Sequence, residues 1–301
     1  SDGGLNYYDN ASQLYKNYLF NSGNLDVPFK DIKTVYVDEV QDRIYVGAHA
    51  GGMMVLHRKS GYIEYYNRHN SNLPSNNIYS IISDGYGGLW VASLEYLLHF
   101  DIDKRNFTIV DVDEDGHKLQ QYNRLLFCDS KKRIWAGGEM GISVFNQVGT
   151  SLLPNTDFQI ASVLKQAFVN CFYETSSGYL WIGTRNGLFA LKESDKQFLQ
   201  YTTENGLPSN VIYGILEDAY GRLWISTNQG LSCLNPESGK FRNFTIMDGL
   251  QGNQFNAGAY CRKDNGYMLF GGVNGITSFR PETLIDNPYA PKPVINKLFV
   301  H

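Results

Sequence analysis

One short pattern recurs along this chain of 301 residues at almost even intervals. In each copy an aromatic residue is followed by an apolar or small residue and then by small residues, and successive copies lie 43 to 46 residues apart. The six copies begin at Tyr45, Trp90, Trp135, Trp181, Trp224 and Phe270. A fixed period of this size indicates a repeat architecture. The chain is therefore expected to be one body built from copies rather than several unlike domains.

The copy that begins near Val211 shows what one repeat contains. Runs rich in β-formers are predicted as strands at 211–217, 222–227, 231–235 and 240–245. Asp218 opens the first turn between them and Gly221 supplies its left-handed position. Four short antiparallel strands per repeat are typical of a propeller blade. The predicted fold class is therefore all-β, a β-propeller of four-stranded antiparallel blades.

The number of blades follows from counting the repeats. Five full repeats and one terminal repeat are expected at 31–72, 76–115, 121–154, 169–204, 210–248 and 254–284. Residues 3–20 resemble only the third and fourth strands of a blade, so this N-terminal blade is expected to be incomplete, with its first strands upstream. Seven blades are predicted, or six if the terminal strands merge into one blade. The propeller is assigned to residues 1–286. Residues 287–301, which begin with a Pro-rich stretch, are assigned to a linker and the first strand of a following β-sandwich.

The repeated tryptophan has a physical explanation in this fold. A single blade cannot bury both of its faces, whereas blades packed around an axis bury one another. Trp90, Trp135, Trp181 and Trp224 are therefore predicted to be buried wedges between neighbouring blades. The alternative is that one of them stacks on a ligand. Helix content is expected to be negligible.

Charge and composition exclude several classes of partner and cofactor. The formal net charge is −4 and no basic cluster occurs, which argues against nucleic acid and against an anionic membrane surface. No apolar stretch approaches the roughly 18 residues of a membrane span. The six histidines show no metal-binding spacing. Neither a metal nor a cofactor is expected.

Several of these repeats resemble a known family, the two-component regulator propeller. The resemblance is carried by GLPSNVIYGILED at 206–218, GRLWISTNQGL at 221–231, LPSNNIY at 73–79 and GYLWIGTRNGL at 178–188. The segments at 249–256 and 270–276 look like the last blade of such a propeller, and the tail from Pro288 is similar to the start of an Ig-like sandwich.

The resemblance implies a sensor role rather than a catalytic one. It implies the periplasmic sensor region of a Bacteroides-type hybrid two-component system, in which two propellers and a sandwich are connected by a membrane helix to a histidine kinase. This chain would be the second propeller. It would respond to oligosaccharides in the regulation of glycan utilisation, and its partners would be the upstream propeller, the downstream sandwich and a second copy in a homodimer.

Some propellers are enzymes, so the fold alone does not exclude catalysis and the candidate catalytic residues must be considered directly. Asp84, Asp129 and Asp218 each lie six residues before a tryptophan. A catalytic acid is expected to be single rather than repeated, so these residues are interpreted as turn formers. The domain itself is predicted not to be an enzyme and to have no catalytic residues. A propeller glycosidase or lyase, and a passive dimerisation or spacer scaffold, are kept as alternatives.

The candidate contact residues lie on one predicted face of the ring. Loops between second and third strands, and loops leading into each first strand, emerge together on this face. The candidates for ligand or partner binding are His49, Glu95, Tyr96, Arg124, Glu139, Arg185, Asn186, Asn228 and Gln229. Amides, guanidinium groups and tyrosine rings suit the hydroxyls and apolar faces of sugars.

Ordinary turn chemistry is the competing explanation for the same residues. An Asn before Gly is common in turns, and this is the favoured interpretation of Asn186 and Asn228. An Asn before a strand can cap backbone groups. The turns do not require Arg185, His49, Tyr96 or Arg124, so a contact role is weighed more heavily for these. The ligand site is expected to be shared with a neighbouring domain, so that this propeller alone binds poorly.

Overall fold

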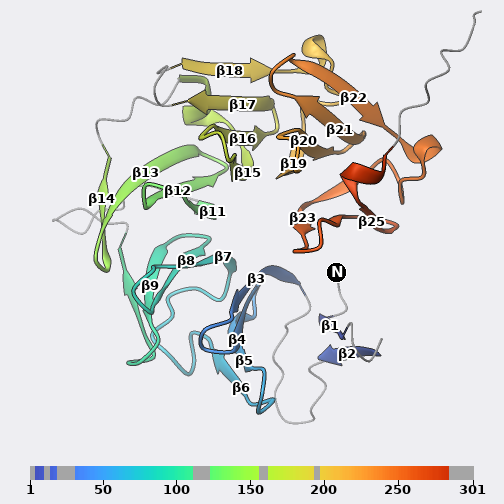
Figure 1. Ribbon diagram of the computed structural model, residues 1–301. Helices are drawn as coiled ribbons and strands as arrows, with labels where there is room; N and C mark the ends of the chain where they lie inside the picture. The colour runs from blue at the N-terminus through green and yellow to red at the C-terminus, as the bar shows by residue number, and fades with distance from the viewer. Residues whose placement is uncertain are drawn as a thin grey trace, which may run out of the picture.

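The computed structural model describes residues 4–9, 14–18, 31–110, 123–155, 162–192 and 197–284. Seven antiparallel sheets stand around a central axis, as Figure 1 shows. The predicted all-β propeller is thereby confirmed. Helical structure in the described ranges is confined to short 3-10 turns, namely η1 (Ser162–Gln166), η3 (Thr203–Asn205), η4 (Ile246–Asp248) and η5 (Pro281–Thr283).

Five of the sheets are complete four-stranded blades, numbered here in chain order. Blade 1 consists of β3 (Ile32–Asp38), β4 (Arg43–Ala48), β5 (Gly52–His57) and β6 (Ile63–Tyr66). Blade 2 consists of β7 (Ile78–Ser83), β8 (Leu89–Ser93), β9 (Leu97–Asp101) and β10 (Asn106–Ile109). Blade 3 consists of β11 (Asn123–Cys128), β12 (Arg133–Gly138), β13 (Gly141–Val148) and β14 (Ser151–Pro154). Blade 4 consists of β15 (Val169–Glu174), β16 (Leu180–Thr184), β17 (Gly187–Lys192) and β18 (Gln197–Tyr201). Blade 5 consists of β19 (Ile212–Glu217), β20 (Leu223–Thr227), β21 (Gly230–Asn235) and β22 (Lys240–Phe244).

The remaining two sheets are smaller. β1 (Leu5–Asp9) pairs with β2 (Leu14–Tyr18), and β23 (Phe255–Arg262), β24 (Met268–Gly272) and β25 (Gly275–Phe279) form a three-stranded terminal blade. Within the described ranges these two sheets are not hydrogen-bonded to each other. The arrangement is compatible with the predicted seven blades and with the alternative of six. The predicted linker and sandwich strand at 287–301 lie outside the described residues.

Every blade has the same internal order. Consecutive strands pair antiparallel, and the first strands β3, β7, β11, β15, β19 and β23 line the centre of the ring (Figure 1). In all five complete blades the pairing of first and second strands shifts by one residue near its start, as between Ile212 and Gly214. A bulge of this kind bends the strand and increases its twist. The repeated sequence therefore reproduces local irregularities as well as strands.

The hydrophobic core lies between blades rather than within them. Trp90 packs with Leu126 and Phe145 of blade 3, and Trp224 packs with Phe255 and Phe270 of the terminal blade. Each of the four tryptophans is at most 2% exposed. The predicted role of these residues as buried wedges is confirmed. Tyr45 fills the same place between blades 1 and 2.

Candidate functional site

The loops of the ring divide into two sets. We call the side with the loops between second and third strands, and those leading into each first strand, the front face. Hydrogen bonds join these two kinds of loop across neighbouring blades, from Gly52 N to Asn76 O at 2.8 Å and from Gly187 N to Asn210 O at 2.7 Å. The turns between first and second strands lie at the opposite ends of these strands, on the back face.

The asparagines that precede first strands are used by the backbone. The Oδ1 atom of Asn76 accepts from Arg68 N, and Oδ1 of Asn210 accepts from Thr203 N, each at 2.9 Å. Asn253 repeats the arrangement with Ile246 N. The side chain and the carbonyl of each asparagine therefore both accept hydrogen bonds from the preceding blade, the side chain from the segment after its fourth strand and the carbonyl from the start of its third strand. The presence of Asn76, Asn210 and Asn253 at equivalent places therefore follows from architecture.

Three predicted contact residues meet on the front face around a residue of blade 2. Arg124 Nη2 forms an ion pair with Glu139 Oε1 at 2.6 Å, and its guanidinium carbon lies 5.0 Å from the centre of the Tyr79 ring. The His49 ring centre lies 6.4 Å from the same tyrosine ring. We call His49, Tyr79, Arg124 and Glu139 the Tyr79 cluster. It joins side chains from blades 1, 2 and 3.

The Tyr79 cluster offers donors, acceptors and an aromatic ring. The side chains of Arg124 and Glu139 are 35% and 38% exposed, so both can reach a ligand. Arg124 Nε is buried without a hydrogen-bond partner among the described residues. Nδ1 of His49 lies 3.9 Å from Asp31 Oδ2. The arrangement can bind hydroxyl groups by hydrogen bonds and an apolar ring face by stacking.

The other predicted residues have separate surroundings. Arg185 places its guanidinium carbon 3.7 Å from the centre of the Phe168 ring, a cation–π contact at the start of blade 4. Tyr96 is half-buried and packs against the core shared by blades 1 and 2, whereas Glu95 is exposed. Arg185 therefore has an aromatic partner of its own, in a different blade from the residues of the Tyr79 cluster. The sequence placed all of these candidates on one face of the ring, and the contacts described above bring His49, Arg124 and Glu139 together around Tyr79.

Threonine side chains hold the front-face turns of blades 4 and 5. Thr184 Oγ1 accepts from the backbone N of Asn186, and Thr227 Oγ1 accepts from that of Gln229. The Oδ1 atom of Asn228 is buried without a hydrogen-bond partner in the described part of the chain. The threonines therefore supply the side-chain bonds in these turns.

On the back face, buried aspartates anchor the tryptophan wedges. Asp129 Oδ2 accepts hydrogen bonds from Trp135 Nε1 at 2.9 Å and from Arg133 Nε at 2.6 Å. In blade 2, Gly88 stands where Arg133 stands in blade 3, and His99 Nε2 bonds to Asp84 Oδ2 at 2.7 Å instead. The periodic aspartates therefore have structural partners already. This agrees with their interpretation as turn residues and leaves no free acid among them.

A serine–glutamate pair joins neighbouring blades beside these turns. Ser130 donates through N and Oγ to the two carboxylate oxygens of Glu174, each at 2.7 Å, and Ser176 binds Glu217 in the same way at 2.9 Å. Gly85 and Cys128 occupy the corresponding positions between blades 2 and 3. The pair therefore cannot form there.

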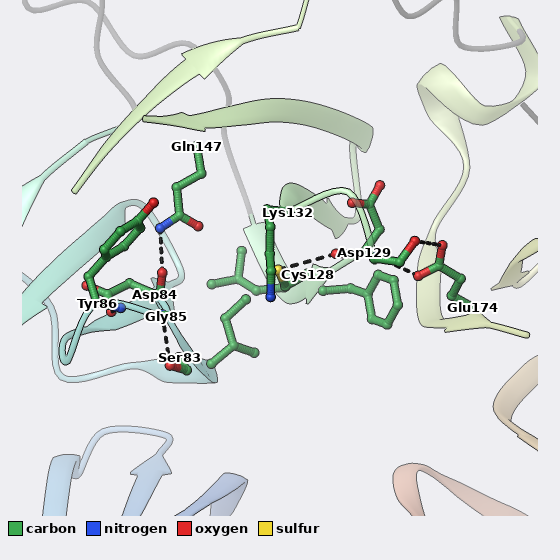
Figure 2. Close-up of a pocket in the computed structure, with 13 residues that line it drawn as sticks. Ser83, Asp84, Gly85, Tyr86, Cys128, Asp129, Lys132, Gln147 and Glu174 are labelled. Carbon is green, nitrogen blue, oxygen red and sulfur yellow. Dashed lines mark hydrogen bonds between the residues drawn. The ribbon is translucent and has the colours of Figure 1, made fainter. Parts of the chain in front are cut away.

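A cavity of about 760 Å³ lies where this pair is missing. Figure 2 shows Asp84 and Tyr86 of blade 2 on one side and Asp129 with Lys132 of blade 3 on the other. Lys132 has φ 63°, the left-handed position that glycine takes in the equivalent turns at Gly178 and Gly221. Sequence reasoning missed this cavity, although the presence of Cys128 where blades 4 and 5 have a glutamate could have indicated it.

The carboxylates that line the cavity are bonded to other side chains. Asp129 is bonded to Arg133 and Trp135, and Glu174 is bonded to Ser130 (Figure 2). Among the described residues no three His, Cys, Asp or Glu side chains gather as a metal site. No helix in the described ranges is both long and apolar enough to cross a membrane.

The chain is a propeller whose blades repeat one packing geometry, whereas their exposed loops differ from blade to blade. The profile of the two-component regulator propeller family matches residues 72–95, 164–186 and 206–229. Each matched stretch covers a loop into a first strand, that strand and the second strand. Three stretches of the chain, each in a different blade, therefore match the two-component regulator propeller repeat.

Comparison with known proteins gives a similar result. The chain is 26% identical to histidine kinase P4 of Formosa agariphila, and the match covers 97% of this chain and 25% of that protein. The chain thus spans about a quarter of the length of this curated relative.

Solved structures share the fold at low identity. Extracellular domains of two proteins assigned to hybrid two-component systems in B. thetaiotaomicron superpose with TM-scores of 0.72 and 0.73, at 19% and 18% identity. Each superposition covers 92% of this chain, and the two cover 37% and 35% of the respective solved chains. A streptogramin B lyase also superposes, with a TM-score of 0.66 at 12% identity over 92% of this chain and 86% of its own. Fold alone therefore does not separate a sensor from an enzyme.

Proposed function

We propose that this propeller belongs to the periplasmic sensor region of a membrane-anchored hybrid histidine kinase and takes part in recognising an oligosaccharide. The repeats match a family named for two-component regulation, and the curated relative is a histidine kinase. The carboxylates on the back face are occupied by structural partners, which favours binding over catalysis.

The observation that carries the proposal is the Tyr79 cluster. Three blades contribute a cation, a carboxylate, an imidazole and a phenol ring to one patch of the front face. The turn that carries His49 does not need the imidazole, because its backbone groups are bonded to Asp31, Asn76 and Asn77. Sugars are bound by this combination of hydrogen-bonding groups and an aromatic ring.

The binding site is proposed to be shared with a neighbouring domain. The cluster is an open patch rather than an enclosed cavity, since its charged side chains are about one-third exposed. A ligand held between this patch and a second domain would bias their relative orientation and so transmit a signal. The neighbouring domains proposed are an upstream propeller and a downstream sandwich, within a dimer.

Calorimetry against a panel of oligosaccharides tests both parts of the proposal. The 301-residue chain is compared with a longer polypeptide of the same protein that includes the neighbouring domains. We expect tight binding to the longer polypeptide and weak binding to the chain alone. Equal affinity would contradict a shared site. Absence of binding to either would contradict the oligosaccharide assignment, and would leave dimerisation as the function to test by measuring the association of the two polypeptides.

A further inference from the structure

The tryptophan wedge of blade 4 differs from the others in one respect. The indole Nε1 of Trp181 is buried and has no hydrogen-bond partner among the described residues, and the side chain is only 2% exposed. The equivalent atoms of Trp135 and Trp224 donate to aspartates at 2.9 Å. Trp90 Nε1 donates to Gln147 Oε1 at 3.3 Å. A buried donor without an acceptor is costly, so this one requires an explanation.

The missing partners are explained by two positions in the sequence. Thr175 stands where blades 3 and 5 have the aspartate, and Tyr179 stands where they have the arginine. The Thr175 hydroxyl cannot replace the aspartate, because it is engaged in its own turn with the backbone of Tyr179 and with Ser177. Both changes occur in the same blade and remove both side chains of the anchor.

A cavity of about 300 Å³ lies between blades 4 and 5 at this place. Trp181, Tyr179, Tyr201 and Tyr220 line it, together with Glu217 and Glu237. The ring of Tyr201 is stacked on Trp181 with centres 5.8 Å apart, and the Tyr179 ring centre lies 6.3 Å from the indole. Tyr220 and Glu237 are exposed, so the cavity is open to solvent at one end.

We infer that this cavity is a second ligand site, on the opposite side of the ring from the Tyr79 cluster, and that it takes one uncharged sugar ring. The aromatic walls suit the C–H faces of a pyranose. A ring hydroxyl at Thr175, in the place that the aspartate has in blades 3 and 5, would accept from the buried Trp181 Nε1, and the exposed Glu237 carboxylate would accept from another hydroxyl. The volume is at the lower end of the range for ligand pockets, which favours one ring over a chain.

Charge argues against ionic ligands in the same cavity. The two carboxylates disfavour an anion, and the Lys192 ammonium, 5.0 Å from the centre of the Tyr179 ring, already occupies the cation–π position there. A cation would also leave the indole donor without an acceptor. The inference does not depend on the function proposed for the Tyr79 cluster.

The test follows the four indole N–H signals of the 15N-labelled chain by NMR. Methyl β-D-glucopyranoside is the probe, because its equatorial substituents leave both ring faces as C–H surface. A Trp181→Phe variant assigns the signal. We expect the probe to shift the Trp181 indole signal with saturation, while the signals of Trp90, Trp135 and Trp224 stay in place. Glucuronate is expected to bind at least about tenfold more weakly.

A substitution in the chain provides the matched control. Thr175→Asp restores the acceptor used in blades 3 and 5, and is expected to raise the unfolding temperature and weaken probe binding at least about tenfold. Thr175→Ser, which keeps the turn hydroxyl, is expected to bind as the natural chain does. An Arg124→Ala variant is expected to leave this site unchanged, which separates it from the Tyr79 cluster.

Two results would overturn the inference. One is a Trp181 indole signal that the probe does not move and that shows a cross-peak to water, since a buried water would then be its partner. The other is unchanged probe affinity in the folded Thr175→Asp variant.

Discussion

Trp224 Nε1 donates a hydrogen bond to Oδ2 of Asp218, six residues earlier in the chain, at 2.9 Å. The same oxygen accepts from Arg222 Nε at 2.7 Å, while the other carboxylate oxygen accepts from the backbone N of Tyr220 and of Arg222. One buried carboxylate thus fixes a turn, an arginine and the wedge between two blades.

Replacing Asp218 by Ala should destabilise the chain substantially. The change leaves the buried Trp224 indole and two turn amides without an acceptor, and we expect a loss of about 3 kcal/mol of unfolding free energy. Urea unfolding followed by tryptophan fluorescence measures it. Asp264→Ala, in the corresponding turn of the terminal blade, is the control, because Asp264 is exposed. A loss below about 0.5 kcal/mol for Asp218→Ala, as for a surface residue, would contradict the anchoring role.

The repeat period determined most of the fold in advance. Trp, the aspartate six residues before it and the glycine turns recur together, so strand number and order could be read from one good copy. The indole–carboxylate bond could not, because spacing along the chain does not show where a side chain points. Blade 2 has Gly88 where blades 3 and 5 have an arginine, and the residue that bonds to Asp84 instead, His99, lies on another strand. The sequence therefore did not indicate this bond.

Removing the indole of Trp181 tests the wedge itself. Trp181→Ala should lower the unfolding free energy by roughly 3–5 kcal/mol, because it leaves a cavity between blades 4 and 5. Thermal unfolding followed by circular dichroism measures the change. Met247→Ala removes a comparably apolar but exposed side chain and should change stability by less than about 0.5 kcal/mol. Similar effects for the two variants would show that the indole is not a packing element.

The glutamates that join neighbouring blades should also contribute to stability. Glu217 is buried, and its carboxylate accepts two hydrogen bonds from Ser176. Glu217→Ala should cost about 1–3 kcal/mol, since the Ser176 donors lose their charged acceptor. Chemical denaturation is the measurement, with the exposed Glu204→Ala as control. Equal midpoints for the two variants would argue against the pair as an inter-blade link.

The cysteines should differ sharply in reactivity. Burial raises the pKa of the Cys171 thiol to about 12 and that of Cys233 to about 11. Because the thiolate is the reactive form, both thiols remain protonated and unreactive at pH 8 in the folded chain. Cys261 is exposed and should react with a disulfide reagent first. Rapid modification of all four cysteines without denaturant would contradict this order.

The contact residues were predicted less completely than the fold. His49 and Arg124 were selected because their turns do not require them, and Glu139 because it lies in a loop on the same predicted face; the structure brings these three together. Tyr79, at their centre, belongs to a first strand, and its orientation depends on the bulge between Ile78 and Ser80. The stacking of Arg185 on Phe168 could not be predicted, because it depends on the loop leading into blade 4.

The ion pair of the Tyr79 cluster distinguishes a contact site from a structural one. Partly exposed pairs contribute only about 0–1 kcal/mol to stability, so Arg124→Ala, Glu139→Ala and the double variant should all unfold close to the natural chain. Binding should respond differently. If a ligand bonds to both groups, removing either group also disturbs the ligand's bond to the other, so the effects of the two substitutions on affinity are not additive. In the longer polypeptide each single variant should weaken oligosaccharide binding by about tenfold or more. Arg58→Ala with Asp42→Ala, a pair of similar exposure on blade 1, is the matched control and should leave affinity unchanged. Full affinity in the folded Arg124→Ala variant would remove the Tyr79 cluster from the ligand site, and a large loss of stability would instead assign this ion pair to the architecture of the ring.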